Sequence, residues 1–212
     1  MEGIVIPFRG AESGKSRLRG VLSETERAHL ASAMFLHVLR IAVAVGGTRQ
    51  VLVATPSETA AEFACAAGAD VIPDAAESLN DALADACVEL KARGVEQVSI
   101  IAADLPLLTR ADVVAILGVP SNRAGIAPDR HGRGTNALTV PADVGFRFFF
   151  GEGSIRAHCD EAARLDLDVV SLRRPGLAVD IDEAADLALL PEGFGLDPLQ
   201  RWQAERQWGR AR

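Results

Sequence analysis

The sequence predicts an α/β fold with three layers (αβα), in which a mainly parallel β-sheet lies between two layers of helices. Short apolar runs of strand length alternate with longer segments of helical periodicity. That alternation is typical of parallel strands whose connecting helices cover both faces of one sheet. Residues 98–102 are apolar at nearly every position, as expected of a central strand buried on both faces.

Turn and capping residues delimit the elements in the first half of the chain. A long helix over residues 23–45 begins with the capping-box spacing of Ser23 and Glu26 and stops at Gly46-Gly47. The other expected elements are strands at residues 4–7, 50–54, 71–73 and 98–102, and helices at residues 57–67 and 78–93.

The alternation is looser in the second half of the chain. We expect helices at residues 109–117, 154–165 and 183–190, and strands at residues 125–127, 137–140 and 169–172. No segment has the composition of a linker, so residues 1–212 form a single domain. Residues 197–212 are predicted to be a C-terminal tail helix that packs Trp202 and Trp208 on the body.

Composition and charge exclude several classes of function. The net charge is −7 and no long basic run occurs before the last dozen residues, so we expect no binding to nucleic acid. The three cysteines lack metal-ligand spacing and are expected to be free thiols in a reducing cytosol. The chain begins with a strand pattern, and no apolar stretch approaches about 20 residues. We therefore expect a cytoplasmic protein that does not contact a membrane.

The loop after the first strand is rich in small residues and cations. Gly14-Lys15-Ser16 resembles part of a phosphate-binding P-loop, but Gly10 and Gly14 enclose three residues where that motif requires four. We instead expect a flexible loop whose amides, together with Lys15 and Arg17, hold a triphosphate. An ordinary surface loop with solvated charges is the alternative.

Carboxylates follow two separate strands. Asp104 comes directly after the strand at residues 98–102, where it is well placed to hold Mg²⁺ or to form a turn. Asp180 and Asp182 alternate with apolar residues, so in an extended segment they point to the same side. Two such carboxylates require a metal ion or a nearby Lys or Arg. Asp182 is alternatively a cap for the helix expected at residue 183.

A glycine-rich region in the second half is suited to binding an anion. Thr135 and Asn136 supply short donors after Gly132 and Gly134. Gly151 and Gly153 precede Ser154, which begins a helix. The hydroxyl of Ser154 and the free amides at a helix N-terminus form a natural anion site. The alternative is that Ser154 is an ordinary N-cap.

No histidine has a catalytic pattern. His131 is expected to be a polar loop residue, and His29, His37 and His158 to be helical residues without a chemical role. No Ser-His-Asp or Cys-His arrangement is present.

Taken together, these segments resemble the 2-phospho-L-lactate guanylyltransferase family (CofC, called FbiD in actinobacteria), over about residues 4–190. The resemblance rests on an ordered set of motifs: Lys15-Ser16-Arg17-Leu18, Leu79-Asn80-Asp81-Ala82-Leu83, Ala103-Asp104-Leu105-Pro106, Gly134-Thr135-Asn136, Phe150-Gly151-Glu152-Gly153-Ser154, and Pro175-Gly176-Leu177 followed by Asp180-Ile181-Asp182. These enzymes make the guanylylated intermediate of deazaflavin coenzyme F420 biosynthesis.

The resemblance implies a fold like that of the nucleotide-diphospho-sugar transferases (GT-A). It implies that Asp104, Asp180 and Asp182 bind Mg²⁺, and that Lys15 meets a phosphate. The acid substrate would contact Thr135, Gly151 and Ser154, and the segment of Asn80 would lie near the base. Family members usually have Gly where Ser78 stands and Ala where Asp81 stands.

The resemblance further implies GTP and a small phosphorylated carboxylic acid as partners, namely phospholactate, phosphoenolpyruvate or phosphoglycerate, and it leaves a homodimer open. The nucleophile would be an acid phosphate that is already anionic, so no general base is needed. Rival readings are a related nucleotidyltransferase acting on molybdopterin or a sugar phosphate, a P-loop-like kinase, and a non-catalytic protein that binds a partner through its tail tryptophans.

Overall fold

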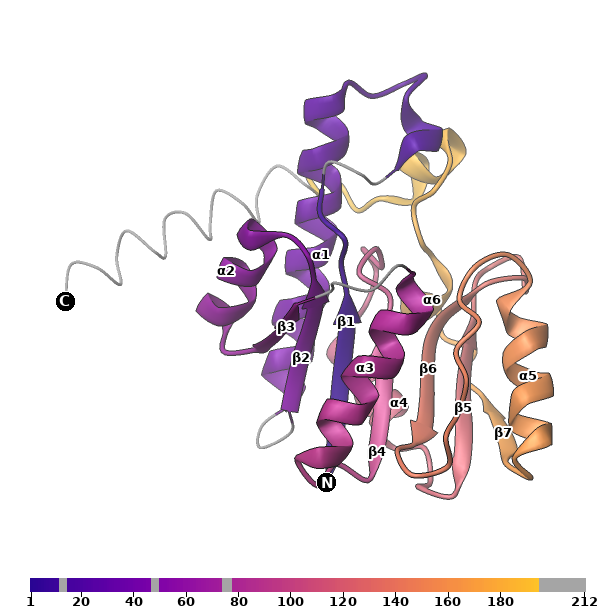
Figure 1. The fold of residues 1–212 in the computed structure, drawn as a ribbon. Helices are drawn as coiled ribbons and strands as arrows, with labels where there is room; N and C mark the ends of the chain where they lie inside the picture. The colour runs from indigo at the N-terminus through magenta and orange to yellow at the C-terminus, as the bar shows by residue number, and fades with distance from the viewer. Residues whose placement is uncertain (12–14, 47–49, 74–77, 195–212) are drawn as a thin grey trace.

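A computed structural model describes residues 1–11, 15–46, 50–73 and 78–194 of the chain, and it contains the predicted sheet. Seven strands are ordered β3-β2-β1-β4-β6-β5-β7, and β4 is at the centre (Figure 1). Among the strands that the structure describes, only β6 runs antiparallel to its neighbours, so the sheet is mainly parallel, as expected. The strands are β1 (Glu2–Pro7), β2 (Gln50–Thr55), β3 (Asp70–Pro73), β4 (Gln97–Ile101), β5 (Arg123–Pro128), β6 (Thr135–Pro141) and β7 (Asp168–Ser171).

Helices cover both faces of the sheet. The buried apolar residues form one cluster on each face of the sheet: α1, α2 and α4 pack on one face, and α3 and α5 pack on the other. The α-helices are α1 (Glu24–Gly46), α2 (Glu58–Ala67), α3 (Leu79–Ala92), α4 (Arg110–Leu117), α5 (Ser154–Arg164) and α6 (Pro175–Ala178), and the 3-10 helices are η1 (Ser16–Leu18) and η2 (Ala184–Leu189). The predicted three-layer arrangement is confirmed.

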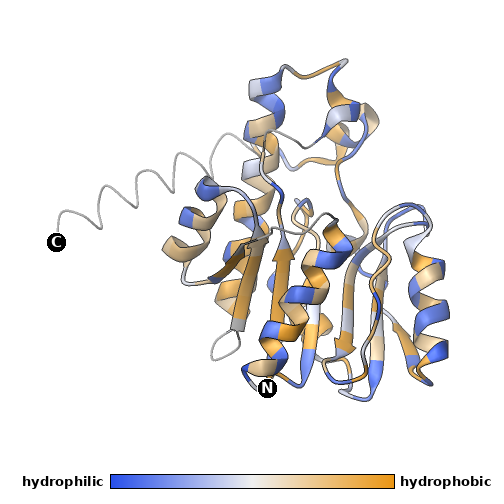
Figure 2. Ribbon diagram, viewed as in Figure 1, coloured by the Kyte–Doolittle hydropathy of each residue, from blue (hydrophilic) through white to orange (hydrophobic). Residues whose placement is uncertain are grey.

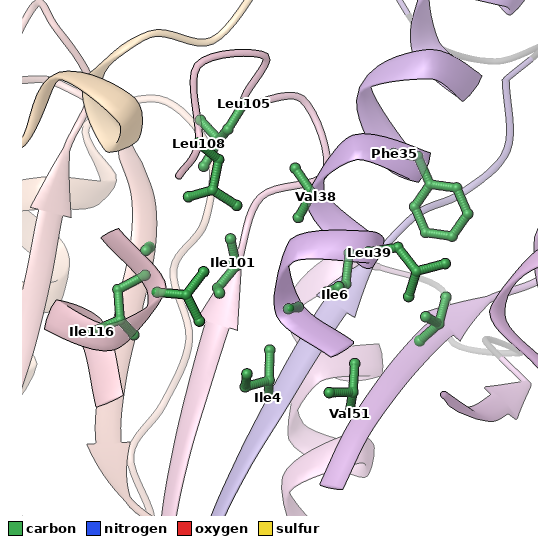
Figure 3. Packing of buried hydrophobic residues seen from close by; sticks show 14 of the residues in the cluster. Ile4, Ile6, Phe35, Val38, Leu39, Val51, Ile101, Leu105, Leu108 and Ile116 are labelled. Carbon is green, nitrogen blue, oxygen red and sulfur yellow. The ribbon is translucent and has the colours of Figure 1, made fainter. Parts of the chain in front are cut away.

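Helix α1 packs across β1 and β4 in the core. Figure 3 shows Val38 and Leu39 of α1 gathered with Ile6 of β1 and Ile101 of β4, and all four side chains are fully buried. Figure 2 shows the apolar residues concentrated in these central strands and on the inward sides of the helices. Burial of a branched apolar side chain contributes about 1.5–3 kcal/mol, so this contact is a main source of stability.

Helix α1 is more apolar than we expected from the sequence. Its capping box is confirmed, since the backbone N–H groups of Ser23 and Glu26 bond to the other residue's side chain at 2.8 and 3.3 Å. The helix contains an 18-residue window long and apolar enough to cross a membrane, and half of that window is buried in the fold. Our expectation that no stretch approaches this length was therefore wrong. The packing of α1 on the sheet accounts for its apolar residues, and it is a core helix.

One expected element needs correction, and other expectations fall on residues that the structure does not describe. The helix expected at residues 183–190 is the 3-10 helix η2, and the short helix α6 was not predicted. Gly47, the loop residues 12–14 and the tail 197–212, with Trp202 and Trp208, lie outside the described residues. The other predicted elements are confirmed within about two residues at each end.

Candidate active site

The chemistry-bearing segments meet at one edge of the sheet because of the strand directions. The parallel strands β1 and β4 end at this edge. Strand β6 is antiparallel, so its first residues lie beside the last residues of β4, and the amide of Ala102 bonds to the carbonyl of Asn136 at 2.9 Å. The segment after β4, which carries Asp104, and the start of β6, which carries Thr135, therefore lie at the same edge although they are distant in sequence. Ligands of α/β sheets bind at such edges.

Three carboxylates converge at this edge. One oxygen from each of Asp104, Asp180 and Asp182 lies within 4.8 Å of the others. Burial raises the pKa of the Asp180 carboxyl, and the charge of Asp104 raises it further. Among the described residues none forms an ion pair with Asp180. Hard cations prefer oxygen ligands of this kind, so the cluster fits a divalent metal ion.

Lys15 supplies one cation to the cluster. Its Nζ donates hydrogen bonds to Asp104 at 2.6 Å and to Asp182 at 2.9 Å. Burial lowers the pKa of Lys15, but the charges of Asp104 and Asp182 outweigh burial, so the pKa lies above its ordinary value. Three carboxylates and one ammonium leave two negative charges, which a divalent ion would balance.

Lys15 is a buried and fixed residue, whereas we expected it to lie in a flexible loop. Its side chain is only 9% exposed, and its φ of 58° lies in the left-handed region that non-glycine residues rarely adopt. Such a backbone persists only where its surroundings hold it, and here the two carboxylates hold the side chain. The tertiary contacts therefore order Lys15 at the cluster.

The segment that carries Asp180 and Asp182 is held by side chains outside the cluster. The buried carboxylate of Asp186 accepts hydrogen bonds from the amides of Asp182 and Glu183, both at 2.8 Å, and is paired with Arg130. Glu183 is the N-cap of η2, so the alternative reading of Asp182 as a cap is wrong. The Asp182 side chain is thereby left to Lys15 and the cluster.

Helix α6 fixes the other end of this segment. A Cβ atom on Gly176 would lie 2.1 Å from Oδ2 of Asp112 and 2.6 Å from the carbonyl oxygen of Leu107. Asp112 cannot retreat easily, because it caps α4 and pairs with Arg174 at 2.6 Å. The absence of a side chain at Gly176 is what allows α6 to approach α4.

We expect Gly176→Ala to destabilise the protein by about 1–3 kcal/mol, the usual cost of overpacking, and to lower its activity. The physical reason is that α6 must shift, and Asp180 follows it in sequence. Thermal denaturation and initial rates would measure both effects. Gly20→Ala is the matched control, because an added Cβ there meets nothing within 4 Å. Equal stability of the two variants would contradict the prediction.

Two pockets flank the carboxylate cluster. An apolar pocket of about 470 Å³ is lined by Pro7, Phe8, Arg9, Gly10, Lys15, Ala31, Met34, Leu79, Ile100, Ala102, Ala103, Asp104 and Phe150. A polar pocket of about 500 Å³ is lined by Arg17, Asp129, Arg133, Gly134, Thr135, Asn136, Gly151, Glu152, Gly153, Ser154, Asp180, Asp182 and Glu183. Each pocket thus contains part of the cluster. A molecule in either one would lie beside the carboxylates.

The polar pocket contains Thr135, Gly151 and Ser154, the residues expected to bind the acid. The N-cap of α5 is Gly153, with a φ of 72°, so Ser154 is not the cap. The amides of Ser154 and Ile155 already bond to the carbonyls of Gly151 and Arg133, both at 3.2 Å. The expectation of free amides at these two positions is therefore wrong, and the hydroxyl of Ser154 is left as the side-chain donor there.

The remaining predicted contacts divide between the pockets and the scaffold. Arg17 lines the polar pocket, where its guanidinium lies 3.9 Å from a carboxylate oxygen of Glu183. The side-chain amide of Asn80 makes two hydrogen bonds with the backbone of Phe150. Its Oδ1 accepts from the Phe150 N–H at 2.7 Å, and its Nδ2 donates to the Phe150 carbonyl at 3.3 Å, so Asn80 joins α3 to the turn before Gly151. It is absent from the described linings of both pockets.

Sequence reasoning missed two residues of this region. Arg133 lines the polar pocket, and its position between two glycines was the only signal for it. His158 of α5 is fully buried, with Nδ1 at 3.0 Å from the Thr135 hydroxyl and Nε2 at 3.0 Å from the Phe149 amide. Burial lowers the pKa of His158 to about 4. No sequence pattern distinguished it from the other helical histidines.

We expect His158 to make folding stability depend on pH. The pKa of its ring is about 4 in the folded protein and near its ordinary value of 6.5 in the unfolded chain. Unfolding therefore takes up a proton between these values, so stability is complete above about pH 6.5 and falls by about 3 kcal/mol as the pH drops to about 4. Urea denaturation from pH 7 to 4 would measure this loss. His158→Gln should show a smaller pH dependence, and an unchanged one would contradict the assignment.

Comparison with known families matches nearly the whole chain. Residues 2–192 match the family described as "Guanylyl transferase CofC like". Phosphoenolpyruvate guanylyltransferase of Chloroflexus aggregans is 34% identical over 192 residues, which are 88% of this chain and 95% of the relative. The enzyme of the same name from Rubrobacter xylanophilus is 36% identical over 197 residues, which are 91% of this chain and 94% of the relative.

Solved structures show the same fold at low identity. The structure of CMP:2-keto-3-deoxy-manno-octonic acid synthetase complexed with CTP has a TM-score of 0.58 and 16% identity. The match covers 89% of this chain and 95% of that chain. A nucleotide-diphospho-sugar transferase structure from Desulfovibrio desulfuricans G20 has a TM-score of 0.69 at 17% identity, and the match covers 89% of this chain and 85% of that chain. The expected likeness to the nucleotide-diphospho-sugar transferases is confirmed at the level of the fold.

Proposed function

Because the chain belongs to the CofC-like guanylyl transferase family, we propose that it transfers GMP from GTP to phosphoenolpyruvate and releases pyrophosphate. The reaction would form the guanylylated intermediate of coenzyme F420 biosynthesis, in the cytoplasm. The observation that carries the proposal is the carboxylate cluster shared by an apolar and a polar pocket.

The two pockets suit the two substrates. A guanine base is flat and its two ring faces are apolar, and the apolar pocket offers Phe8, Met34 and Leu79. Phosphoenolpyruvate carries a phosphate and a carboxylate, and the polar pocket offers the cations Arg17 and Arg133 with the hydroxyls of Thr135 and Ser154. GTP in the first pocket would bring its phosphates toward the cluster and the acid.

The chemistry follows from charge. The attacking phosphate oxygen is already an anion at neutral pH, so the reaction needs no general base. The main obstacle is repulsion between two anionic reactants, which Lys15 at the cluster reduces from the protein side. Asp104, Asp180 and Asp182 would hold Mg²⁺, which supplies electrostatic stabilisation of the phosphates. The pocket walls would position the two reactants beside each other, which would supply much of the remaining rate acceleration.

The test is incubation of the protein with GTP, Mg²⁺ and, separately, phosphoenolpyruvate, 2-phospho-L-lactate and 3-phosphoglycerate. We expect pyrophosphate release with phosphoenolpyruvate and a product that contains GMP joined to the acid phosphate. Preference for another acid would change the substrate but not the reaction. Release of GDP in place of pyrophosphate would contradict the reaction class, and turnover only with a sugar phosphate or molybdopterin would favour a related nucleotidyltransferase.

A further inference from the structure

His158 lies behind the polar pocket and reaches it through one side chain. It is fully buried, and the edge of its ring meets Phe150 with the ring centroids 4.8 Å apart. It is not among the described residues that line the pocket. Its Nδ1 contacts Thr135, which does line the pocket. Nothing in the proposed chemistry uses this histidine.

The hydrogen bonds of the ring determine its tautomer. The backbone N–H of Phe149 donates to Nε2 at 3.0 Å, and Nε2 accepts a hydrogen bond only when it carries no proton. The ring is neutral near pH 7, because burial lowers the pKa of His158 to about 4. A neutral imidazole has one N–H group, so the proton is on Nδ1. Nδ1 must then donate to the hydroxyl oxygen of Thr135, 3.0 Å away.

The tautomer in turn determines what Thr135 can do. A hydroxyl has one proton to donate and two lone pairs. One lone pair of Thr135 accepts from Nδ1, so its own proton is available to another acceptor. The opposite tautomer would have turned that proton toward the ring. Thr135 therefore faces the polar pocket as a donor, which suits an anionic oxygen.

We propose that His158 is a positioning residue, which keeps the Thr135 hydroxyl as a hydrogen-bond donor to an anionic oxygen of the phosphorylated acid. This inference rests on the proposed function, since it names the substrate of the same site. The second contact of His158, with the Phe149 amide, holds the turn that leads to Gly151 and Ser154. One ring thus orients two parts of the pocket.

Two substitutions separate these contacts. In His158→Asn the amide nitrogen lies near the position of Nδ1, so donation to Thr135 is kept and the contact with Phe149 is lost. In His158→Gln the amide oxygen lies near the position of Nε2, so the contact with Phe149 is kept and donation to Thr135 is lost. We expect His158→Gln to raise the KM for the acid about tenfold, with the KM for GTP little changed, because a hydrogen bond to a charged group is weakened. His158→Asn should raise it less.

A double-mutant cycle with Thr135→Val tests whether the two residues act together. Thr135→Val alone should raise the KM for the acid about tenfold or more. In that background His158→Gln should add little. Independent, multiplying effects of the two changes would overturn the proposal, as would equal increases in the KM for GTP and for the acid. His29→Gln, at an exposed position of α1, is the control.

Nitrogen NMR of the imidazole gives a readout that does not require turnover. The intact protein labelled with ¹⁵N should show His158 with a protonated Nδ1 and an unprotonated Nε2 at pH 7, and the exposed His29 provides a reference. A proton on Nε2, or a doubly protonated ring, would overturn the proposal. A protein that turns over no phosphorylated acid would instead overturn the proposed function, so the two failures are distinguishable.

Discussion

Asparagine in place of Asp180 is expected to reduce guanylyl transfer by at least about 10³-fold and to leave the thermal stability equal or higher. The activity should fall because the proposed metal site loses one of its three carboxylates, and a bound metal ion would supply several kcal/mol of charge stabilisation. The stability does not fall because burial and the charge of Asp104 already disfavour the ionised form of Asp180. A neutral amide of the same shape relieves that repulsion.

Two measurements separate a metal ligand from a structural residue at Asp180. Calorimetric titration with Mg²⁺ or Mn²⁺ should show weaker binding in Asp180→Asn, and thermal denaturation without metal should show no loss. Asp186→Asn is the matched control, because Asp186 holds the backbone of Asp182 and is paired with Arg130. That control should lose stability. A destabilised Asp180→Asn protein with unchanged metal binding would remove Asp180 from the proposed metal site.

Lys15→Ala is expected to lower the rate by about 10²–10³-fold, or roughly 2.7–4 kcal/mol, as for a lost electrostatic donor in an active site. The structure changes what we expect of its stability. A loop lysine with few contacts could be removed without consequence, but the Lys15 side chain is 9% exposed and forms ion pairs with two carboxylates. We therefore expect the variant to be less stable than the wild type, and Mg²⁺ to restore part of that loss.

Labelled GTP shows which phosphate is transferred to the acid, and at what rate with and without Lys15. Label on the α-phosphate should appear in the acid product, and label on the γ-phosphate should leave as pyrophosphate, at a lower rate in Lys15→Ala. Arg17→Ala is the control, since the Arg17 side chain is 69% exposed and its effect should be smaller. Full activity of Lys15→Ala would remove this residue from the reaction, and transfer of the γ-label to the acid would overturn the reaction class.

The fold was predictable because its signals are local. Ser23, Ser57, Ser78 and Thr109 each precede a helix and accept a hydrogen bond from its first turn, which makes those boundaries readable from the sequence. The short elements were harder to predict. Helix α6 spans only Pro175–Ala178, which is too short for a periodic pattern to predict it. It also depends on the close approach to α4 that Gly176 allows.

The residue types of the site were predictable from the sequence, but the contacts between its residues were not. The sequence by itself determined that Asp104, Asp180 and Asp182 lie after elements of an α/β sheet, and that a cation was needed near them. Only the tertiary structure decided that Lys15 is that cation, that Asp186 and not Asp182 supports η2, and that the buried His158 is bonded to Thr135. The physical reason is the distance along the sequence over which each kind of interaction acts. Capping and periodicity act within a few residues, whereas these contacts join segments brought together by the antiparallel β6 and by the packing of α5 and α6.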